Sequence, residues 1–375
     1  MNWKSATLGQ TCKMYQPKTL SAKEMKSNGA YAVYGANGII GNHDQYNHEA
    51  SQLLVTCRGA TCGAVNVSKP YSWINGNAMV IQPDTTKVSL RYMEYICRGG
   101  IDLSAAITGA AQPQIIRKSL EPIPFFYPSL AEQSRIVAKL DTALASIAQA
   151  LAVTEARREQ VEALKAALLS TSYDDLCGPA KSVRLGQVCD ILSGGTPKSK
   201  EPTYWGGDLP WLTPKDMGQL QGPFVSKTAR QISKKGLVNS TAKCLPAHSI
   251  ILSSRAPIGY VAVNQVPMSF NQGCKGLVPR DNILVEYLYY FLLSSRQRLN
   301  DLGTGTTFKE ITGKTLADVD LPLPAITEQK SIVAKLGAAF AQIQVALDAI
   351  SSVRQNYQAL QSALMAQALQ PRDAA

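Results

Sequence analysis

The stretch Glu132-Gln-Ser-Arg-Ile-Val-Ala-Lys-Leu140 occurs a second time, nearly unchanged, as Glu328-Gln-Lys-Ser-Ile-Val-Ala-Lys-Leu336. These copies are 196 positions apart, and the same offset relates Asn75 to Asn271. Near the start of the chain the offset is 177, where Leu8-Gly-Gln-Thr-Cys12 matches Leu185-Gly-Gln-Val-Cys189. The chain therefore consists of two tandem copies of one repeat. The offsets differ by 19 residues, and we expect these extra residues of the second copy within Ser193–Met217.

Each copy ends in a segment rich in Leu and Ala, in which apolar residues recur at alternating steps of three and four. This heptad spacing is typical of a long helix with one apolar stripe. A helix of about 42 residues is roughly 60 Å long, and its stripe needs a partner of similar length. We expect the two helices to pair, with Arg158 and Arg354 in a polar layer. The alternative is two separate helical hairpins within ordinary cores. The remaining residues expected to pair the helices are Val137, Leu140, Leu144, Ile147, Leu151, Val333, Leu336, Phe340, Ile343, Leu347 and Ile350.

The segments before the helices mix strand and helix signals. The strand-like runs are Leu53–Cys57, Gly63–Val67, Ala78–Gln82, Ile250–Ser254, Tyr260–Val263 and Lys275–Val278, and the helical ones are Val88–Arg98 and Ile283–Asn300. The predicted fold class is α+β. It has two tandem pseudo-symmetric repeats, each an α/β block followed by a long helix, and the helices pack as an antiparallel coiled coil. The predicted domain boundaries are 1–128, 129–176, 177–325 and 326–375.

Charge is distributed unevenly along the 375 residues. The chain has 38 basic and 27 acidic side chains, a net charge of +11. The two blocks carry net charges of +5 and +7, whereas the helical segments carry −2 and +1. A basic surface favours an anionic partner. Apolar residues make up 45% of the chain, which excludes a disordered protein.

The sequence also suggests a cellular compartment. No run approaches 18 uninterrupted apolar residues, and the N-terminal residues lack the apolar core of a signal peptide. The eight cysteines form no CxxC pair, so we expect reduced thiols in a cytosolic protein.

With these features, the chain resembles the specificity (S) subunits of type I restriction–modification systems over nearly its whole length. The resemblance rests on the tandem blocks and helices and on Pro128-Ser-Leu-Ala-Glu-Gln-Ser-Arg-Ile-Val137 with its copy Pro324-Ala-Ile-Thr-Glu-Gln-Lys-Ser-Ile-Val333. Further matching phrases are Ser193-Gly-Gly-Thr-Pro197, Leu209-Pro-Trp-Leu-Thr-Pro214 and Gly303-Thr-Gly-Thr-Thr-Phe308.

The resemblance implies a function. Each block is then a target recognition domain that reads one half of a split sequence in double-stranded DNA. The helices set the spacing between the half-sites and dock two methyltransferase (M) subunits, which bind S-adenosylmethionine and methylate adenine. Restriction (R) subunits add ATP-driven cleavage. The chain itself is then a cytoplasmic, bacterial or archaeal protein that binds no cofactor, while S-adenosylmethionine, ATP and Mg belong to the partner subunits.

The chain lacks recognisable catalytic and metal-binding motifs. An adenine methyltransferase needs an Asn/Asp-Pro-Pro-aromatic loop, and the nearest stretch, Glu121-Pro-Ile-Pro-Phe125, lacks the paired prolines. Gly313-Lys314-Thr315 is no Walker A motif, because Phe occupies position 308 where that motif has its first Gly. The three histidines form no plausible metal set, and Cys57 and Cys62 are expected in the core. We therefore predict no catalytic residue and no metal ligand.

Candidate DNA contacts lie on basic and Gly-rich loops. Arg58 and Arg255 each follow an apolar strand, at matching positions of the two copies, so that they can reach a groove; the competing interpretation is a structural ion pair. For each lysine the competing interpretation is a solvated surface charge. The other candidates are Lys13, Lys18, Lys23, Lys26, Asn37, Asn42, His43, Thr196, Lys198, Lys200, Lys215, Arg230, Lys234 and Lys235. Tyr71, Trp73 and Trp205 are expected to stack on a ligand or to pack in the core.

Two other functions remain open at this point. A regulatory or orphan specificity protein would have a missing or different M partner. A helical scaffold would bind proteins without DNA readout. A stand-alone modification enzyme needs catalytic motifs, for which the chain has no room.

Overall fold

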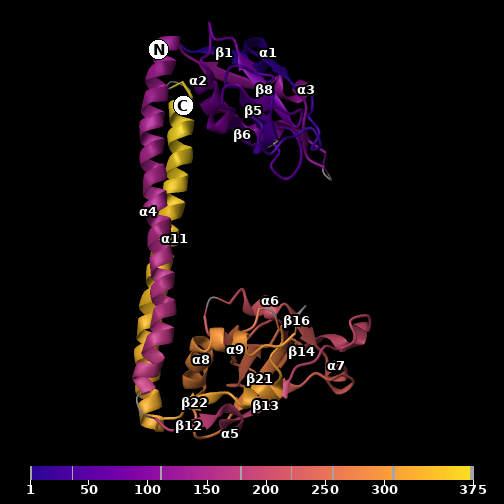
Figure 1. The fold of residues 1–375 in the computed structure, drawn as a ribbon, viewed down its shortest axis with the longest axis vertical. Coiled ribbons are helices and arrows are strands. Elements are labelled where there is room, and N and C mark those ends of the chain that lie inside the picture. Colours follow the sequence, from indigo (N-terminus) through magenta and orange to yellow (C-terminus); the bar gives the residue numbers. More distant parts are fainter. Residues whose placement is uncertain are drawn as a thin grey trace. The chain divides into compact units, whose positions relative to one another are not determined.

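The structure is a computed structural model that describes residues 2–35, 37–109, 112–177, 180–220, 222–255, 257–305 and 309–371, without the side chains of 170–177. The chain divides into two compact units (Figure 1). Unit 1 comprises Met1–Glu155 and Ser351–Ala375, and unit 2 comprises Ala156–Ile350. Each unit thus contains one globular block, part of one long helix and part of the other.

The block of unit 1 contains two principal sheets. The first has the strand order β2-β8-β5-β6 and the second has the order β4-β3-β7. A short pair, β1 with β11, lies directly before the long helix in sequence, and β9 pairs with β10. The elements are β1 (Lys4–Thr7), α1 (Leu8–Thr11), β2 (Cys12–Tyr15), β3 (Tyr31–Gly35), β4 (Gly38–His43), β5 (Leu53–Thr56), β6 (Val65–Val67), β7 (Trp73–Ile74), β8 (Ala78–Pro83), α2 (Leu90–Tyr95), η1 (Ile96–Gly100), η2 (Leu103–Ala106), β9 (Ile107–Thr108), β10 (Gln114–Ile115), α3 (Arg117–Leu120) and β11 (Pro124–Tyr127).

The block of unit 2 repeats this plan with additions. Its sheets have the orders β13-β21-β18-β19-β15 and β16-β14-β20-β17, and β12 pairs with β22. The elements are β12 (Ser182–Arg184), α5 (Leu185–Val188), β13 (Cys189–Ser193), η3 (Pro202–Tyr204), β14 (Trp205–Leu212), α6 (Pro214–Met217), β15 (Phe224–Val225), β16 (Arg230–Ile232), α7 (Lys234–Val238), β17 (Cys244–Leu245), β18 (Ile250–Ser253), β19 (Val261–Asn264), β20 (Met268–Phe270), β21 (Cys274–Pro279), α8 (Val285–Ser294), α9 (Arg296–Asp301), α10 (Gly313–Ala317) and β22 (Asp320–Pro322). The predicted strand and helix runs of both blocks are confirmed.

Strand pairing shows where the second copy is longer. In unit 1, Val33 of β3 faces Trp73 of β7, and in unit 2, Trp211 of β14 faces Ser269 of β20. The offset between copies is thus 178 at β14 and 196 at β20, so the extra residues follow β14. The prediction that they lie within Ser193–Met217 was wrong, because that range is mostly β14 and the loop before it. The Gly-rich loop is bonded to β20, since the Gly195 amide donates to the Phe270 carbonyl.

Hydrogen bonds also correct the helical alignment by one residue. The Tyr92 hydroxyl donates to the Phe126 carbonyl, and the Tyr287 hydroxyl donates to the Pro322 carbonyl. Both tyrosines are fully buried. The counterpart of Tyr92 is therefore Tyr287, whereas the uniform sequence offset of 196 had matched it with Leu288.

Two long helices, α4 (Leu130–Cys177) and α11 (Ile326–Ala368), confirm the predicted helical segments. A buried glutamine fixes the start of each helix to its block. Gln133 donates to the carbonyls of Lys87 and Pro128 and accepts from the Ser89 amide. Gln329 makes the equivalent bonds to Asn282, Pro324 and Leu284. The repeated Glu-Gln motif thus connects each globular block, called the head from here on, to its long helix.

The apolar stripe of each helix serves the globular core as well as helix packing. In unit 1, Ile136 and Leu140 of α4 share one core with Met365 and Leu369 from the end of α11. These two helical segments run in opposite directions side by side (Figure 1). In unit 2, Ile332 and Leu336 of α11 lie in the core of the block, and Leu168 of α4 packs against it.

The predicted helix-pairing residues differ in burial. Leu140, Ile147, Leu336 and Ile343 are buried, whereas Arg158 and Arg354 are exposed. Phe340 packs its ring on Tyr290 of α8, with the ring centroids 5.5 Å apart, so it contacts the block. The half-buried members of the stripe are Val137, Leu144, Leu151, Val333, Phe340, Leu347 and Ile350.

By length and composition, Leu130–Leu169 and Ile326–Ala368 are apolar enough to cross a membrane. This is weak evidence, because a helix that packs on a soluble core passes the same test. Both helices contribute buried side chains to the unit cores.

Candidate nucleic-acid interface

The second sheet of each unit ends in an edge strand that carries predicted contact residues. In unit 1 this strand is β4, with Asn42 and His43, and in unit 2 it is β16, which begins at Arg230. Both pair antiparallel with the equivalent neighbour, β3 or β14. The outer side of an edge strand has no partner strand, although in β4 the Lys26 amide donates to the Asn42 carbonyl at 2.9 Å. The two units therefore offer equivalent platforms with different side chains.

The β3–β4 hairpin of unit 1 presents polar groups around an aromatic pair. The rings of His43 and Trp73 meet edge to face, with centroids 5.3 Å apart. Their Nδ1 and Nε1 atoms are buried and have no hydrogen-bond partner among the described residues. The Asn42 amide donates to the Ser27 carbonyl at 3.4 Å, while exposed Asn37 accepts from Asn66 at 3.3 Å. The predicted Asn and His residues thus gather on one hairpin.

The predicted lysines of unit 1 occupy different settings. Lys18 and Lys23 are exposed on the loop between β2 and β3. Lys13 lies on β2 with its ammonium 5.3 Å from the centre of the Tyr15 ring. Lys26 forms an ion pair with Asp44. Exposed lysines supply the salt-dependent attraction to phosphates, and Lys26 contributes less because its charge is partly neutralised.

Arg58 and Arg255 occupy structurally equivalent positions, as expected. Arg58 forms a backbone bridge with Gln114, and Arg255 forms one with Glu310. The side chains differ, because Arg255 Nε lies 2.9 Å from Glu310 Oε2 in an ion pair. Glu310 also lies 3.7 Å from the ammonium of buried Lys275. The structural interpretation therefore applies to Arg255, whereas Arg58 faces a neutral amide at this position.

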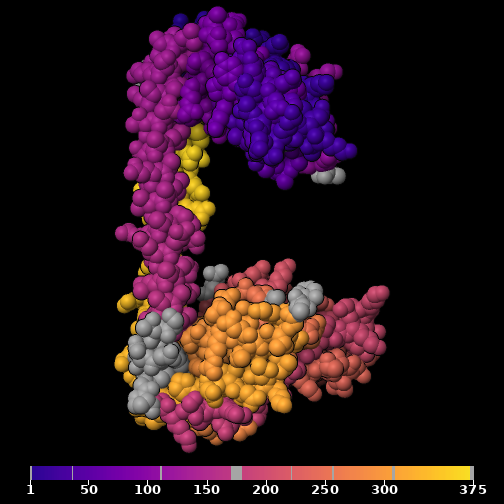
Figure 2. Space-filling view, viewed as in Figure 1, coloured from indigo at the N-terminus to yellow at the C-terminus, as the bar shows by residue number. Residues whose placement is uncertain are grey.

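The predicted residues of unit 2 are spread over one loop and two short helices. Thr196 is half-buried, and its hydroxyl bonds to Gln272 and accepts from the Asn271 amide at 3.2 Å, so it fixes the loop. The exposed lysines are Lys198 and Lys200 on the loop after β13, Lys215 on α6, and Lys234 and Lys235 on α7. Figure 2 shows residues near 205–240 in pink beside those near 250–300 in orange on the surface of this unit.

Arg230 lies against two indole rings. Its guanidinium carbon is 3.5 Å from the ring centre of Trp205 and 5.3 Å from that of Trp211. The two indoles meet edge to face at 5.1 Å. The sequence had singled out Arg230 and Trp205 separately. Their stacking depends on strand pairing between β14 and β16, which no local pattern specifies.

Exposed apolar side chains near β4 were missed by the sequence reasoning. Ile39 and Ile40 are 53% and 52% exposed. Tyr46 packs edge to face between Tyr31 and Tyr71, and Tyr71 has a left-handed backbone with φ of 51°. Large exposed apolar groups and strained backbone mark functional loops. The available signal was the pair of isoleucines within a Gly/Asn-rich loop.

Four of the seven cysteines whose side chains the structure describes are buried. Burial is the main cause that raises the pKa of Cys57 to about 11 and that of Cys274 to about 12. Thiols with such pKa values are protonated at neutral pH and suit a core. Among the described residues, no three His, Cys, Asp or Glu side chains gather as a metal site.

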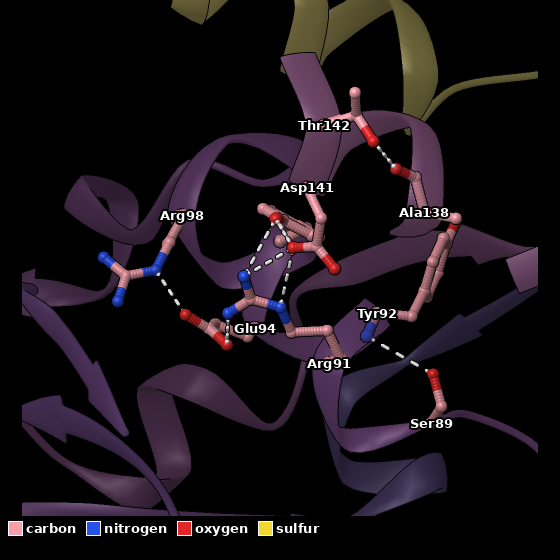
Figure 3. Close-up of polar contacts among 9 residues, drawn as sticks. Ser89, Arg91, Tyr92, Glu94, Arg98, Ala138, Asp141 and Thr142 are labelled. Carbon is pink, nitrogen blue, oxygen red and sulfur yellow. Dashed lines mark hydrogen bonds and ion pairs between the residues drawn. The ribbon is translucent and has the colours of Figure 1, made fainter. Parts of the chain in front are cut away.

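An ionic network joins the head of unit 1 to its long helix (Figure 3). Arg91 on α2 reaches Asp141 on α4 through Nε at 3.1 Å and Nη2 at 2.5 Å, and Tyr95 also bonds to Asp141. Buried Glu94 lies between Arg91 and Arg98, at 2.6 and 2.9 Å. Burial alone would raise the pKa of Asp141, but the bonds from Tyr95 and Arg91 outweigh it and lower that pKa.

The corresponding joint of unit 2 is aromatic. Tyr289, Tyr290 and Gly337 stand where unit 1 has Glu94, Tyr95 and Asp141. The rings of Tyr289 and Tyr290 meet edge to face at 5.3 Å. The two heads are thus fixed to their helices by different chemistry.

Comparisons with known proteins give consistent similarities. A family model described as "Type I restriction modification DNA specificity domain" matches residues 1–163 and 179–348. The type I restriction enzyme EcoR124I/EcoR124II specificity subunit of Escherichia coli is 31% identical over 350 residues, which cover 87% of this chain and 84% of that protein. The MjaIX specificity subunit of Methanocaldococcus jannaschii is 37% identical over 155 residues, 41% of this chain and only 36% of that protein.

Two solved structures share the fold. A chain from a study titled as the structural basis of complex assembly and conformational transition of the type I R-M system has a TM-score of 0.78 and 21% identity. The match covers 98% of this chain and 97% of that one. The HsdS subunit from Thermoanaerobacter tengcongensis has a TM-score of 0.55 and 21% identity over 98% of this chain and 96% of that one.

Proposed function

This chain belongs to the family of type I restriction–modification DNA specificity subunits, and on that premise we propose how its two units divide the recognition of DNA. Unit 1 reads one half of a bipartite duplex target through β4 and its hairpin. Unit 2 reads the other half through β16 and the loops beside it. The observation that carries this proposal is that equivalent edge strands bear different side chains, His43 with Asn42 in one unit and Arg230 in the other.

The charge of the blocks supports this division. Their net charges of +5 and +7 provide attraction to phosphates without sequence preference. Amide, imidazole and guanidinium groups on the edge strands provide the hydrogen bonds that distinguish bases. Affinity and specificity therefore reside in different residues of the same unit.

We further propose that the long helices fix the distance between the half-sites and dock two M subunits. A continuous helix of 48 residues such as α4 spans roughly 70 Å and stretches very little. Beyond the head joints many side chains of both helices are exposed, Arg354 among them, which leaves helical surface for partners.

The chemistry of modification and cleavage then belongs to the partners. We propose that this chain is non-catalytic and acts in the cytoplasm, that the M subunits bind S-adenosylmethionine, and that the R subunits use ATP and Mg. The absence of a recognisable methyltransferase or Walker A motif in the sequence supports this division.

The deciding experiment is co-expression of the chain with its neighbouring M subunit in a host that lacks adenine methylation, followed by methylome sequencing. We expect adenine methylation at one bipartite sequence. The purified chain alone should transfer no methyl group and hydrolyse no ATP. Methyl transfer by the isolated chain, free of M subunit, would contradict the assignment.

A mobility shift with random duplex DNA separates this function from a protein-binding scaffold. We expect a shift that weakens steeply with salt. No shift, even with the M subunit present, would favour the scaffold. A shift without methylation at any site would favour the regulatory or orphan specificity protein.

A further inference from the structure

Arg230 differs from Arg184, Arg255 and Arg280, the arginines that lie on or just after other strands of unit 2 in sequence. Arg184 pairs with Asp318 and Arg280 pairs with Asp190, at 2.9 and 2.8 Å, and Arg255 pairs with Glu310. Arg230 is exposed and forms no ion pair with a carboxylate among the described residues. Its guanidinium lies instead over the Trp205 ring.

The Gly-rich loop after β13 holds the two indoles in place. The Trp211 indole N–H donates to the Gly195 carbonyl at 3.0 Å, and the Trp205 indole N–H donates to the Lys198 carbonyl at 3.2 Å. A side chain at Gly195 would lie 2.4 Å from the Ala242 amide nitrogen, so only glycine fits this close approach. The loop motif therefore builds a rigid aromatic platform.

The backbone of Arg230 is fixed to the same platform. The Thr228 hydroxyl donates to the Arg230 carbonyl at 2.6 Å and accepts from the Trp211 amide at 3.0 Å. Arg230 also faces Trp211 directly in the β14–β16 register. Both ends of the residue, its carbonyl and its guanidinium, are thus positioned by β14.

The N–H donors of a guanidinium form a planar fork, and stacking on an indole fixes the orientation of that plane. Such a planar fork matches the O6 and N7 acceptors of guanine in the major groove, and lysine does not provide it. Stacking also reduces the side-chain entropy lost when the fork binds. The arrangement is therefore suited to reading one base.

We propose that Arg230 reads a guanine in the half-site of unit 2, with Trp205 as the residue that positions it. This inference rests on the proposed function and assigns the recognition of one base to one residue. Arg255, which the sequence favoured equally, is held by Glu310 and does not read this base.

The test uses the complex of this chain with its M subunit and duplexes in which each base pair of both half-sites is replaced in turn. The wild-type complex should methylate the guanine-containing duplex about 5- to 150-fold better than its replacements at one position. Arg230→Gln should abolish that preference at this position alone. Arg230→Lys should retain binding but weaken the preference, because an ammonium can donate to guanine without the planar fork. Trp205→Leu should reduce the preference more than Trp205→Phe.

The control is Arg184→Gln, an exposed, ion-paired arginine of the same unit, which should leave all preferences unchanged. Intact discrimination at the other positions of the unit 2 half-site shows that unit 2 of each variant is folded. If the wild-type complex has a bipartite target and all its base preferences survive Arg230→Gln, this inference alone is overturned. A wild-type complex without a bipartite target overturns the proposed function as well.

Discussion

At the scale of single residues, the structure separates two arginines that the sequence treats as equals. We predict that Arg58→Ala weakens DNA binding by about 1–3 kcal/mol and relaxes only its own half-site if Arg58 contacts a base. Arg255→Ala should leave the base preferences of both half-sites unchanged, because Glu310 holds the Arg255 side chain in an ion pair. The measurement is a binding titration against duplexes altered in either half. If affinity and specificity remain unchanged in both halves, the mutated residue is not a reader.

Residue types alone were enough to predict part of the candidate DNA-binding surface. The sequence identified Asn42, His43, Arg58 and Arg230 because polar and basic residues beside glycines are typical of binding loops. It offered an ion pair as one interpretation of Arg255 but did not identify the partner, because Glu310 is 55 positions away and only the backbone bridge brings the two together. Side-chain partners across strands depend on register, which composition does not encode.

At the scale of elements, the joint between each head and its helix depends on one buried glutamine. We predict that Gln133→Ala loosens unit 1 and Gln329→Ala loosens unit 2. Each change leaves buried backbone groups without partners, at about 1–3 kcal/mol per group. Hydrogen–deuterium exchange should rise at Ser89 in the first variant and at Leu284 in the second. Equal exchange at both sites in either variant would show that the two joints do not act separately.

The ionic joint of unit 1 should respond to acid. The pKa of Asp141 lies below its ordinary value of 3.8, so its carboxylate adds stability above that pH, and this stability is lost as the pH falls through the lowered pKa. We predict that the stability difference between wild type and Asp141→Asn shrinks from about pH 5 to pH 2. Thermal unfolding across this range measures it. A difference that does not depend on pH would show that packing, not charge, fixes this joint.

The helices and strands could be predicted from the sequence more fully than the contacts that connect them. Heptad spacing located both long helices, and short strand-like runs located the strands, because these patterns reflect burial within single segments. The sequence did not predict the one-residue shift of the alignment at Tyr287 or the residues added after β14. A repeat can gain residues in its loops without disturbing the heptad or strand pattern.

At the scale of the whole molecule, helix length should determine the target spacer. Four residues inserted after Lys165 lengthen α4 by about 6 Å and rotate the downstream residues by about 40°. At 3.4 Å per base pair, that length is close to two base pairs. We predict a spacer altered by roughly one or two base pairs with both half-sites intact, as read by methylome sequencing. An unchanged spacer would mean that the insertion loops out, and a changed half-site would mean that the helix itself reads bases.

The core of unit 1 is completed by residues from the far end of the sequence. Met365 and Leu369 pack against the block, and side chains added at Gly99 or Gly100 would meet these two residues at 3.1 to 3.2 Å. On the ribosome, the N-terminal head therefore emerges first but must wait, with this apolar surface uncovered, until the last helix has been made. Unit 2, whose residues are contiguous, can close earlier. The apolar surface of unit 1 is thus synthesised well before the residues that cover it, whereas the residues of unit 2 are made in one continuous stretch.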